Sequence, residues 1–582
     1  MQKRREFLKS LAAAPALSAV SAQEQKRPNV LIILTDDQGY GDFSCHGNPV
    51  LRTPNMDKLH SQSLRFTDFH SAPMCTPTRG QLMTGLDALY NGATSVTAGR
   101  AMLRRGIPTM AEIFRSNGYG TGIFGKWHLG DNYPYRPMDR GFEEAKYFFG
   151  FGLSSAPEFA NDYFNGTYRH NGKPKKFDGY CTDFWFGEAM SWITKQQSAN
   201  KPFFCYLPTN APHGPAWVDE KYAAPYRKDK LPAAFFGMIA NLDENLGKLE
   251  TFLEEKGLRE NTVVIFMTDN GATAGFSVFN AGMRGRKQMI YEGGHRVPCF
   301  VSWPAGKIPA GTDNDTPAQM QDLLPTLIDL LNLRNEPNAT FDGRSLAKLI
   351  RSRKDDFSQR MMVVQYGQIP VKWDAAVIWG KWRLIRGEEL YNLATDPAQT
   401  SDVAKTNEAV LEKMKEHYER WWTRVEPGLK NFAPITLGSD VENPVRLCSS
   451  DWQDIYCDNP GHVSDAVGGP RGGPWNVFIE KDGTYEIQLH RWIPELGLPL
   501  TAGREPQKMT VGQLPAGKAL PIAGAKLMIA GQQLEAKSKP GDKFIPFKVK
   551  LKGRTKTQLH AWFQDAQGND VSGAFYAVVR RV

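Results

Sequence analysis

The segment that begins at Cys75 combines residue types and spacings that suit the binding of an anion. Residues 75–85 read CTPTRGQLMTG. We expect Cys75 to lie where a loop opens into a helix. The start of a helix suits an anion, because its free backbone N–H groups and its dipole attract negative charge. Arg79 follows one turn later and can direct its planar fork of donors toward the same point. A cysteine is more often a small buried hydrophobe, but the Pro and Arg at these offsets argue against that alternative.

Oxygen-bearing side chains end two apolar runs elsewhere in the chain. Asp36 and Asp37 end the run that starts at residue 28, and Asp269 and Asn270 follow the run at residues 262–268. Such runs are typical of buried parallel strands, whose carboxyl ends meet at one edge of a sheet. Four such side chains predict a site for a hard cation, and the absence of His or Cys from the two pairs disfavours zinc. The alternative is that each pair only caps a turn or a helix.

The Cys75 segment resembles the signature C-x-P-[ST]-R-x-x-L-x-T-G of the type I, formylglycine-dependent sulfatase family, with Thr78 where many members have Ser. The resemblance extends over most of residues 28–425, through motifs in the family's order. They are TDDQGYGD at 35–42, GKWHLG at 125–130, APH at 211–213, TDNGA at 268–272, and Lys287 four residues before YEGG. The family belongs to the alkaline phosphatase superfamily, and this chain looks most like its bacterial polysaccharide sulfatases.

The resemblance implies how the nucleophile and the metal are held. Cys75 would be oxidised to formylglycine by a formylglycine-generating enzyme or an anaerobic maturase, and the hydrate of formylglycine would attack sulfur. Arg79 would stabilise that hydrate. A calcium ion would be bound by residue 75 and the two strand-end pairs, namely Asp36, Asp37, Cys75, Asp269 and Asn270. The cation would polarise the sulfate and lower the pKa of the attacking hydroxyl.

The resemblance also assigns roles to two lysines and two histidines. Lys126, His213 and Lys287 would bind the sulfate group. Lys126, Lys287, Arg79 and the cation would neutralise its charge as that charge redistributes in the transition state. His213 would help to protonate the leaving alcohol, with Lys287 assisting. His128 would hydrogen-bond the formylglycine hydroxyl and later take its proton. A lone histidine is usually a surface or core residue, so these roles depend on the positions of the histidines within the motif set.

The function implied is hydrolysis of a sulfate monoester on a sulfated saccharide, such as one containing galactose or N-acetylgalactosamine. Two alternatives stay open. One is a phosphonate or phosphate ester hydrolase, because relatives in the superfamily share the fold, the metal site and the type of nucleophile. The other is a non-catalytic carbohydrate-binding relative, against which the complete set of site residues argues.

Strands and helices alternate along residues 23–356, which predicts an α/β catalytic domain with a large, mostly parallel sheet flanked by helices. Expected strands lie near residues 28–36, 64–69, 119–124, 203–207, 262–268 and 298–303. Expected helices lie near residues 54–63, 109–117, 184–195, 233–257 and 321–331. Because ligands bind beyond the carboxyl ends of the strands in such sheets, this architecture would gather the motif residues into one site.

Two smaller units are expected after the catalytic domain. Residues 357–430 predict an α+β subdomain, with short antiparallel strands near 361–366, 374–378 and 382–385 and a helix near 403–424. Residues 440–582 alternate short strands with Gly/Pro turns and predict a β-sandwich. Its aromatic residues could line a sugar site, although packing in the core is the commoner use for them; they are Trp452, Tyr456, Trp475, Trp492 and Trp562.

Residues 1–22 predict an export signal. A basic start with Arg4 and Arg5 followed by Phe-Leu-Lys resembles the bacterial twin-arginine motif, and a small-residue cleavage site precedes Gln23. We therefore expect a protein exported to the periplasm or the extracellular space; an ordinary secretory signal or an N-terminal helix is the alternative. No apolar run reaches the roughly 20 residues of a transmembrane helix.

Composition excludes several classes. The 582 residues include 71 Lys+Arg and 62 Asp+Glu, a net charge of +9, and the basic residues are scattered, so no nucleic-acid partner is expected. Seven cysteines in this length exclude a disulfide-dense scaffold. Cys448 and Cys457 lie close together in the last region and are a plausible disulfide of an exported protein.

Overall fold

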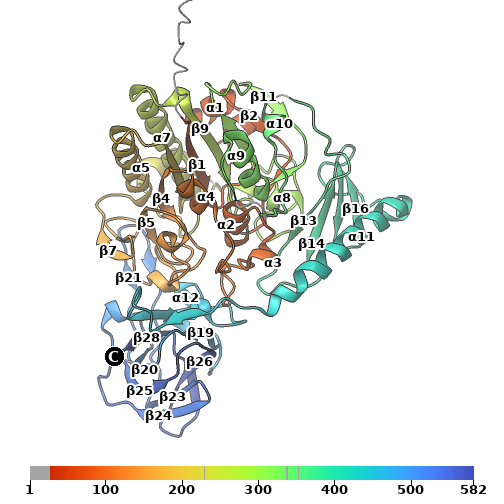
Figure 1. Ribbon diagram of the computed structural model, residues 1–582. Coiled ribbons are helices and arrows are strands. Elements are labelled where there is room, and N and C mark those ends of the chain that lie inside the picture. The colour runs from red at the N-terminus through yellow and green to blue at the C-terminus, as the bar shows by residue number, and fades with distance from the viewer. Residues whose placement is uncertain (1–26, 229, 336–338, 352) are drawn as a thin grey trace, which may run out of the picture.

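The computed structural model describes residues 27–582 except 229, 336–338 and 352, so the expected export signal lies outside the described residues. Within the described part of the chain, no helix combines the length and the apolar character needed to cross a membrane. Figure 1 shows a large upper lobe around one sheet, a small sheet with a long helix beside it, and a separate C-terminal lobe below.

The large lobe is built on a ten-stranded mixed sheet with the order β11-β2-β10-β9-β1-β8-β4-β5-β6-β7 (Figure 1). The central strands β9, β1, β8, β4 and β5 are parallel to one another. Their bounds are Thr262–Thr268, Asn29–Thr35, Phe203–Pro208, Gly120–Lys126 and Glu144–Phe148. The outer strands are β10 Cys299–Ser302, β2 Leu64–Phe66, β11 Thr312–Asn314, β6 Thr167–His170 and β7 Lys173–Lys176.

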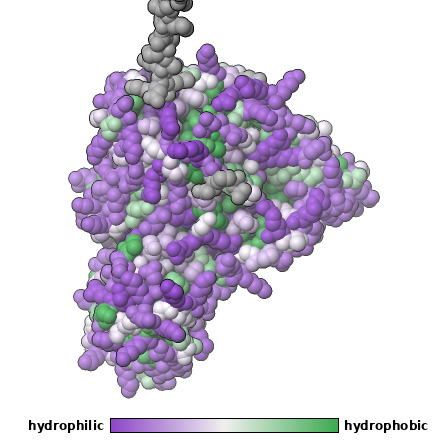
Figure 2. Space-filling model, viewed as in Figure 1, coloured by the Kyte–Doolittle hydropathy of each residue, from purple (hydrophilic) through white to green (hydrophobic). Residues whose placement is uncertain are grey.

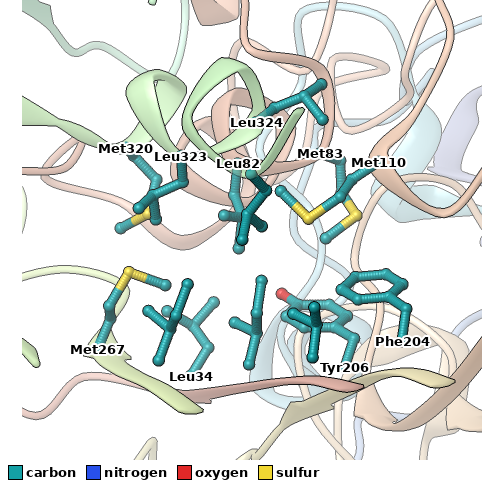
Figure 3. Close-up of a cluster of buried hydrophobic side chains, with 14 of the residues drawn as sticks. Leu34, Leu82, Met83, Met110, Phe204, Tyr206, Met267, Met320, Leu323 and Leu324 are labelled. Carbon is teal, nitrogen blue, oxygen red and sulfur yellow. The ribbon is translucent and has the colours of Figure 1, made fainter. Parts of the chain in front are cut away.

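Helices cover both faces of this sheet because its central strands are apolar on both sides. Val30, Ile32 and Leu34 of β1 pack in one buried cluster, and the alternating residues Leu31 and Ile33 pack in another. The first face is covered by α2 Cys75–Thr84, α4 Met110–Ser116 and α9 Leu323–Leu331. Figure 3 shows side chains of these helices meeting those of the sheet. The second face is covered by α1 Pro54–Ser61, α5 Cys181–Ser198 and α7 Ala233–Glu255.

The small sheet has four antiparallel strands in the order β13-β14-β15-β16. Their bounds are Met361–Gln365, Ala375–Trp379, Trp382–Ile385 and Glu389–Asn392, and the helix α11 Glu408–Val425 packs on them. The sequence predicted the first three strands but missed β16. The helix begins five residues later than the expected residue 403, because Ala404–Thr406 forms a short 3-10 turn.

The C-terminal lobe has two main sheets packed face to face. One contains β17 Ile435–Leu437, β19 Trp475–Ile479, β26 Thr555–Gln564, β23 Gly524–Ile529 and β24 Gln532–Lys537, with β27 Asp570–Gly573 paired to β26. The other contains β18 Val445–Cys448, β28 Tyr576–Arg581, β20 Gly483–His490 and β25 Ile545–Leu551. Residues of both sheets share one buried cluster. The predicted fold class, a mostly parallel α/β sheet followed by all-β sheets, is confirmed.

The expected disulfide between Cys448 and Cys457 is wrong, because both are free thiols in the structure. Each sulfur is buried and makes its own contact. Cys448 Sγ lies 4.0 Å from Ser449 Oγ, and Cys457 Sγ lies 3.8 Å from the carbonyl oxygen of Val467. Figure 2 shows mostly hydrophilic residues on the visible face, with hydrophobic ones scattered between them.

Candidate active site

Neighbouring parallel strands bring the two strand-end pairs together. Thr35 at the end of β1 is in register with Thr268 at the end of β9, so the residues that follow each strand meet at the same sheet edge. The backbone N–H of Asp37 donates to Asp269 Oδ1 at 3.1 Å, and Asn270 Nδ2 donates to Asp37 Oδ1 at 2.8 Å. The two pairs expected to meet at one sheet edge therefore form one cluster of buried oxygen atoms.

Helix α2 brings Cys75 and Arg79 to this cluster. Cys75 is the first residue of α2, at its N-terminus, and its Sγ and carboxylate oxygens of Asp36 and Asp269 all lie within 4.8 Å of one another. Arg79 is fully buried. Its Nη2 donates to Asp269 Oδ2 at 2.8 Å, and its Nη1 donates to the carbonyl oxygen of Lys126 at 3.1 Å.

Two buried lysines complete the set of charges. Lys126 ends β4, and its Nζ donates to Asp36 Oδ2 at 2.6 Å. Lys287 Nζ lies 2.5 Å from Asp37 Oδ1. With Arg79, the two lysines place three cations beside three carboxylates. Although burial alone raises the pKa of Asp37, Lys287 and His213 hold that pKa below its usual range.

The oxygen cluster fits a hard cation. Asp36 Oδ1 and Asn270 Oδ1 are buried and have no hydrogen-bond partner. Burial and the nearby charge of Asp269 raise the pKa of Asp36 well above its usual value, although Lys126 and Arg79 oppose that rise. A cation bound between the two strand ends would accept these free lone pairs, and carboxylate and amide oxygens are the ligands that calcium prefers.

His128 follows β4 and has an unpaired ring nitrogen. Its Nε2 lies 3.1 Å from the carbonyl oxygen of Val96, so Nε2 carries the hydrogen and Nδ1 keeps a lone pair. Nδ1 is buried without a partner. Burial, with the charges of Lys126 and Arg79, lowers the pKa of His128 well below its usual value. The ring is neutral, and its Nδ1 can accept a proton.

His213 lies across the site, in the loop after β8. Its Nδ1 lies 2.7 Å from the carbonyl oxygen of Gly214, and its Nε2 lies 3.6 Å from Asp37 Oδ2. Burial and the charges of Lys287 and Lys126 lower the pKa of His213 to about 3, against the opposing charge of Asp37. Nδ1 therefore donates to Gly214, and Nε2 faces the charged cluster.

The thiol of Cys75 is poorly suited to act unmodified. Burial raises its pKa, although Lys126 and Lys287 oppose that rise. A thiolate is the reactive form of cysteine, and a raised pKa makes it scarce at neutral pH. Burial therefore disfavours a free thiolate at position 75.

All ten catalytic and metal-binding residues expected from the sequence lie in this one site. Three residues from later segments also reach it, and of these the sequence had named only Tyr456, as one of five aromatic candidates. Tyr366, in the loop after β13, packs beside Cys75. Tyr456 and Asp458 come from the C-terminal lobe and interact electrostatically with Lys287. Of the five aromatic residues expected to line a sugar site or to pack, the four tryptophans are buried and only Tyr456 is exposed. Only the exposure of Tyr456, which a sequence does not show, distinguishes it from the others.

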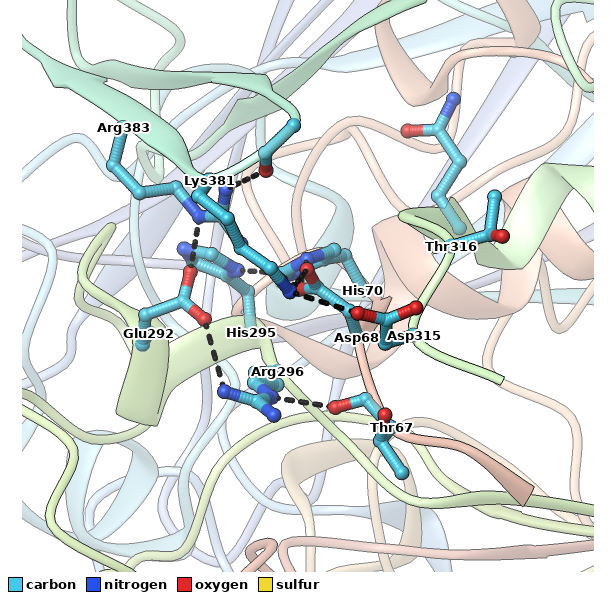
Figure 4. Close-up of polar contacts among 12 residues, drawn as sticks. Thr67, Asp68, His70, Glu292, His295, Arg296, Asp315, Thr316, Lys381 and Arg383 are labelled. Carbon is cyan, nitrogen blue, oxygen red and sulfur yellow. Dashed lines mark hydrogen bonds and ion pairs between the residues drawn. The ribbon is translucent and has the colours of Figure 1, made fainter. Parts of the chain in front are cut away.

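A second buried polar cluster lies beside the site and joins the small sheet to the large one (Figure 4). His70, Glu292 and His295 are close enough together to hold a metal ion. However, the nitrogens of both histidine rings already have partners. His70 Nε2 lies 2.8 Å from Asp68 Oδ1, and His70 Nδ1 lies 3.0 Å from His295 Nδ1. His295 Nε2 lies 3.2 Å from the carbonyl oxygen of Ile290. Glu292 in turn accepts from Arg383 Nε at 2.6 Å. We interpret this cluster as a buried ion network.

The comparisons with known proteins agree with this geometry. A family model described as "Sulfatase" matches residues 28–333, and one described as "N-sulphoglucosamine sulphohydrolase, C-terminal" matches residues 285–423. N-acetylgalactosamine-6-sulfatase of Canis lupus familiaris is 31% identical over 362 residues, covering 57% of this chain and 67% of that protein. Arylsulfatase G of Mus musculus is 31% identical over 373 residues, covering 56% and 69%.

A solved structure gives the same result. The crystal structure of Ps i-CgsB in complex with k-i-k-neocarrahexaose superposes with a TM-score of 0.62 at 29% identity, covering 68% of this chain and 92% of that chain. The resemblance inferred from the motifs is confirmed. Because the sulfatase model spans more than half of the 582 residues, the chain belongs to the sulfatase family and is a sulfuric ester hydrolase.

Proposed function

We propose that this sulfatase removes sulfate from a sulfated saccharide at the site around residue 75. The observation that carries the proposal is the convergence of three buried cations, three carboxylates and two neutral histidines at the N-terminus of α2. The names of the relatives support a sugar substrate, since one is an N-acetylgalactosamine-6-sulfatase and one solved structure holds a neocarrahexaose.

The cationic side chains would bind the ester through its sulfate oxygens. Lys126 and Lys287 would hold those oxygens, and Arg79 would stabilise the group at position 75. Each now pairs with a carboxylate, so none is free to move far, and preorganised charge of this kind stabilises a transition state in which charge shifts from sulfur to the leaving oxygen.

The two histidines would handle the protons on opposite sides of the ester. Nε2 of His213 would carry a proton to the leaving alcohol oxygen, because Asp37 and the bound anion favour its protonation. Nδ1 of His128 would take the proton from the hydroxyl at position 75, since that nitrogen holds a free lone pair. This division needs no rearrangement of the hydrogen bonds that Gly214 and Val96 already accept.

We further propose that Cys75 is converted to formylglycine by a maturation enzyme, and that the hydrated aldehyde supplies the hydroxyl that attacks sulfur. Cys75→Ala should abolish turnover of nitrophenyl sulfate without changing the thermal transition, because the side chain is small and buried. Cys205→Ala, a buried thiol in β8, is the matched control and should keep activity. The mass of the peptide that contains residue 75 reports the conversion. Retained turnover in Cys75→Ala would refute the assignment.

The competing reaction is hydrolysis of a phosphate ester. Nitrophenyl phosphate and nitrophenyl sulfate differ only in the transferred group, so the ratio of their kcat/KM values separates the two functions. We expect the sulfate to be hydrolysed faster. Equal or faster turnover of the phosphate would contradict the proposal.

We propose that Asp36, Asp37, Asp269, Asn270 and residue 75 hold a calcium ion, which would add positive charge at the sulfate. Removing metal with a chelator should abolish turnover, and calcium should restore it. Asp269→Asn should weaken calcium binding measured by calorimetry, because it removes one of the anionic ligands. Asp178→Asn, which changes an exposed acid outside the site, should leave calcium binding unchanged. Full activity of the metal-free protein would refute the site.

The remaining organisation is also proposed. Residues 1–22 would direct export to the periplasm through the twin-arginine pathway, and the mature chain would divide into units at 23–356, 357–430 and 440–582. A reporter fused to residues 1–30 should lose export in a strain that lacks the twin-arginine translocase. Unchanged export in that strain would contradict the assignment.

A further inference from the structure

A segment of the C-terminal lobe, residues 449–467, lies against the catalytic lobe. It contains the turn Ser449–Asp451 and the helix α12 Pro460–Asp465, which Figure 1 shows between the two lobes. The backbone N–H of Ala156 donates to the carbonyl oxygen of Asp458 at 2.6 Å, and Thr97 Oγ1 donates to the carbonyl oxygen of Ser450 at 3.0 Å. The segment is therefore held on the large lobe by its own backbone.

A narrow pocket lies between this segment and the catalytic residues. His128, Asp131 and Phe151 line it from the large lobe, and Ser450, Asp451 and Asp458 line it from the C-terminal lobe. Its volume is about 10 Å³, which is room for one group the size of a water molecule or a hydroxyl. The pocket thus accepts a single small substituent.

The pocket adjoins the reacting groups. His128, whose buried Nδ1 has no partner, forms part of its wall. The ring of Phe151 lies 5.1 Å from the ring of His213. Burial raises the pKa of Asp458 to about 7 even though Lys287 and Lys126 oppose the rise. A substrate whose sulfate lies on those lysines would therefore present its nearest substituents to this pocket.

The lining has a definite chemistry. Three carboxyl groups and one serine hydroxyl face the pocket, and none of the residues that line it is a lysine or arginine. Carboxyl oxygens accept hydrogen bonds from hydroxyl groups. A second sulfate does not fit a pocket of this size, and the lining offers it no cationic side chain, which discriminates against multiply charged substrates.

We propose that this pocket binds a free hydroxyl of the sugar ring that carries the reacting sulfate, and that the C-terminal lobe thereby selects a ring with no second anionic group beside it. Asp458 accepts the hydrogen bond from that hydroxyl, and Asp451 and Asp131 close the pocket around it. This assignment rests on the proposed function, because it assumes that the sulfate of the same ring lies on Lys126 and Lys287. The hydroxyl itself is recognised by residues that do not bind the sulfate.

The test compares three kinds of substrate on the full-length matured enzyme. Nitrophenyl sulfate has no ring hydroxyl, galactose and N-acetylgalactosamine monosulfates have hydroxyls and one charge, and the corresponding disulfates have a second charge. Asp458→Leu keeps the side-chain size and removes the acceptor. We expect it to lower kcat/KM for the preferred monosulfate on the order of tenfold more than for nitrophenyl sulfate. Asp458→Asn restores one acceptor and should recover part of that loss.

Further variants separate recognition from a structural effect. Asp451→Ala enlarges the pocket and should reduce the discrimination between the monosulfate and the disulfate. Asp465→Ala makes the same change at the exposed end of α12 and should change neither ratio. An equal loss on all substrates in Asp458→Leu, or no loss on any, would overturn the proposal.

Binding distinguishes failure of this inference from failure of the proposed function. If the matured enzyme hydrolyses no sulfate ester, the proposed function fails. Binding of the same monosulfated sugars to Cys75→Ala, measured by calorimetry, then tests the pocket independently of turnover. Weaker binding after the added Asp458→Leu change supports the pocket, and unchanged binding overturns it.

Discussion

At the residue scale, burial governs the protonation of several acids near the active site. Asp42, in the motif that follows β1, is fully buried. One of its oxygens accepts the backbone N–H of Gly39 at 2.9 Å, and the other has no partner. Burial raises the pKa of Asp42 to about 7, and the hydrogen bond from Gly39 opposes only part of that rise. The folded protein therefore keeps a proton on Asp42 at pH values where an unfolded chain has released it.

This gives the first prediction, on Asp42→Asn. The pKa of Asp42 is higher in the folded state than in the unfolded chain. Protonation of Asp42 therefore contributes fully to the free energy of unfolding of the wild type below about pH 4, and this contribution is lost as the pH rises through about 7. Asparagine does not ionise, so the stability of Asp42→Asn relative to the wild type should rise by roughly 2–4 kcal/mol from about pH 4 to 8. Urea unfolding at several pH values measures this. Asp178→Asn, at an exposed acid, should show no such trend, and a flat difference for Asp42→Asn would contradict burial as the cause of the raised pKa.

At the element scale, helix α2 owes its position to packing. It has only ten residues and all of them are buried, and an isolated helix of that length is marginal in water. Leu82 and Met83 pack in the same cluster as Leu34 of β1 (Figure 3). Gly80 allows a close approach to the next segment, since a Cβ there would lie 2.9 Å from Ala93 Cβ. The core contact thus fixes the helix whose first residue is Cys75.

The second prediction concerns this contact. Leu82→Ala should lower the free energy of unfolding of the large lobe by about 2–5 kcal/mol, because it leaves a cavity between α2 and the sheet. Val371→Ala, at an exposed apolar residue, should change it by no more than about 0.5 kcal/mol. Denaturant unfolding followed by tryptophan fluorescence measures both. Equal effects of the two changes would show that α2 is not held by this packing.

At the scale of the whole molecule, buried charges join the small sheet to the large lobe. Arg383 of β15 is fully buried. Its Nε donates to Glu292 at 2.6 Å and its Nη2 donates to Asp68 at 2.8 Å (Figure 4). Although burial raises the pKa of Glu292, Arg383 and His70 hold that pKa at about 2. Glu292 lies five residues after Lys287, so this joint also anchors the segment that carries the second site lysine.

The third prediction concerns the removal of the ion pairs of Arg383. Arg383→Met should lower the free energy of unfolding by about 3–5 kcal/mol, because it removes the buried positive charge that Glu292 and Asp68 share. Arg386→Met removes an arginine from the same small sheet, where it lies 3.5 Å from Asp374 at the surface, and should cost no more than about 1 kcal/mol. Urea unfolding compares the two. A similar small loss for both would mean that the buried pairs do not hold the lobes together.

Much of the candidate site could be predicted from the sequence because its residues follow strand ends. Asp36, Lys126 and Asp269 each come directly at or after the end of a buried strand. Parallel strands end at a shared edge of the sheet regardless of the length and course of the loops between them. The local sequence pattern of each strand was therefore enough to place these three residues together. The strand β16 was missed because Glu389–Asn392 is short and only half apolar.

The sequence by itself determined the family, the class of fold and the residues that meet at the carboxyl edge of the sheet, since periodicity and motif spacing are local properties. Only the tertiary structure decided which later segments reach that edge. Tyr456 and Asp458 lie more than 300 residues after Cys75, and their approach depends on how the C-terminal lobe packs against Ala156 and Thr97. Such packing is set by the summed contacts of two surfaces, which no short run of residues encodes. For the same reason, only the structure showed that Cys448 and Cys457 remain apart as free thiols.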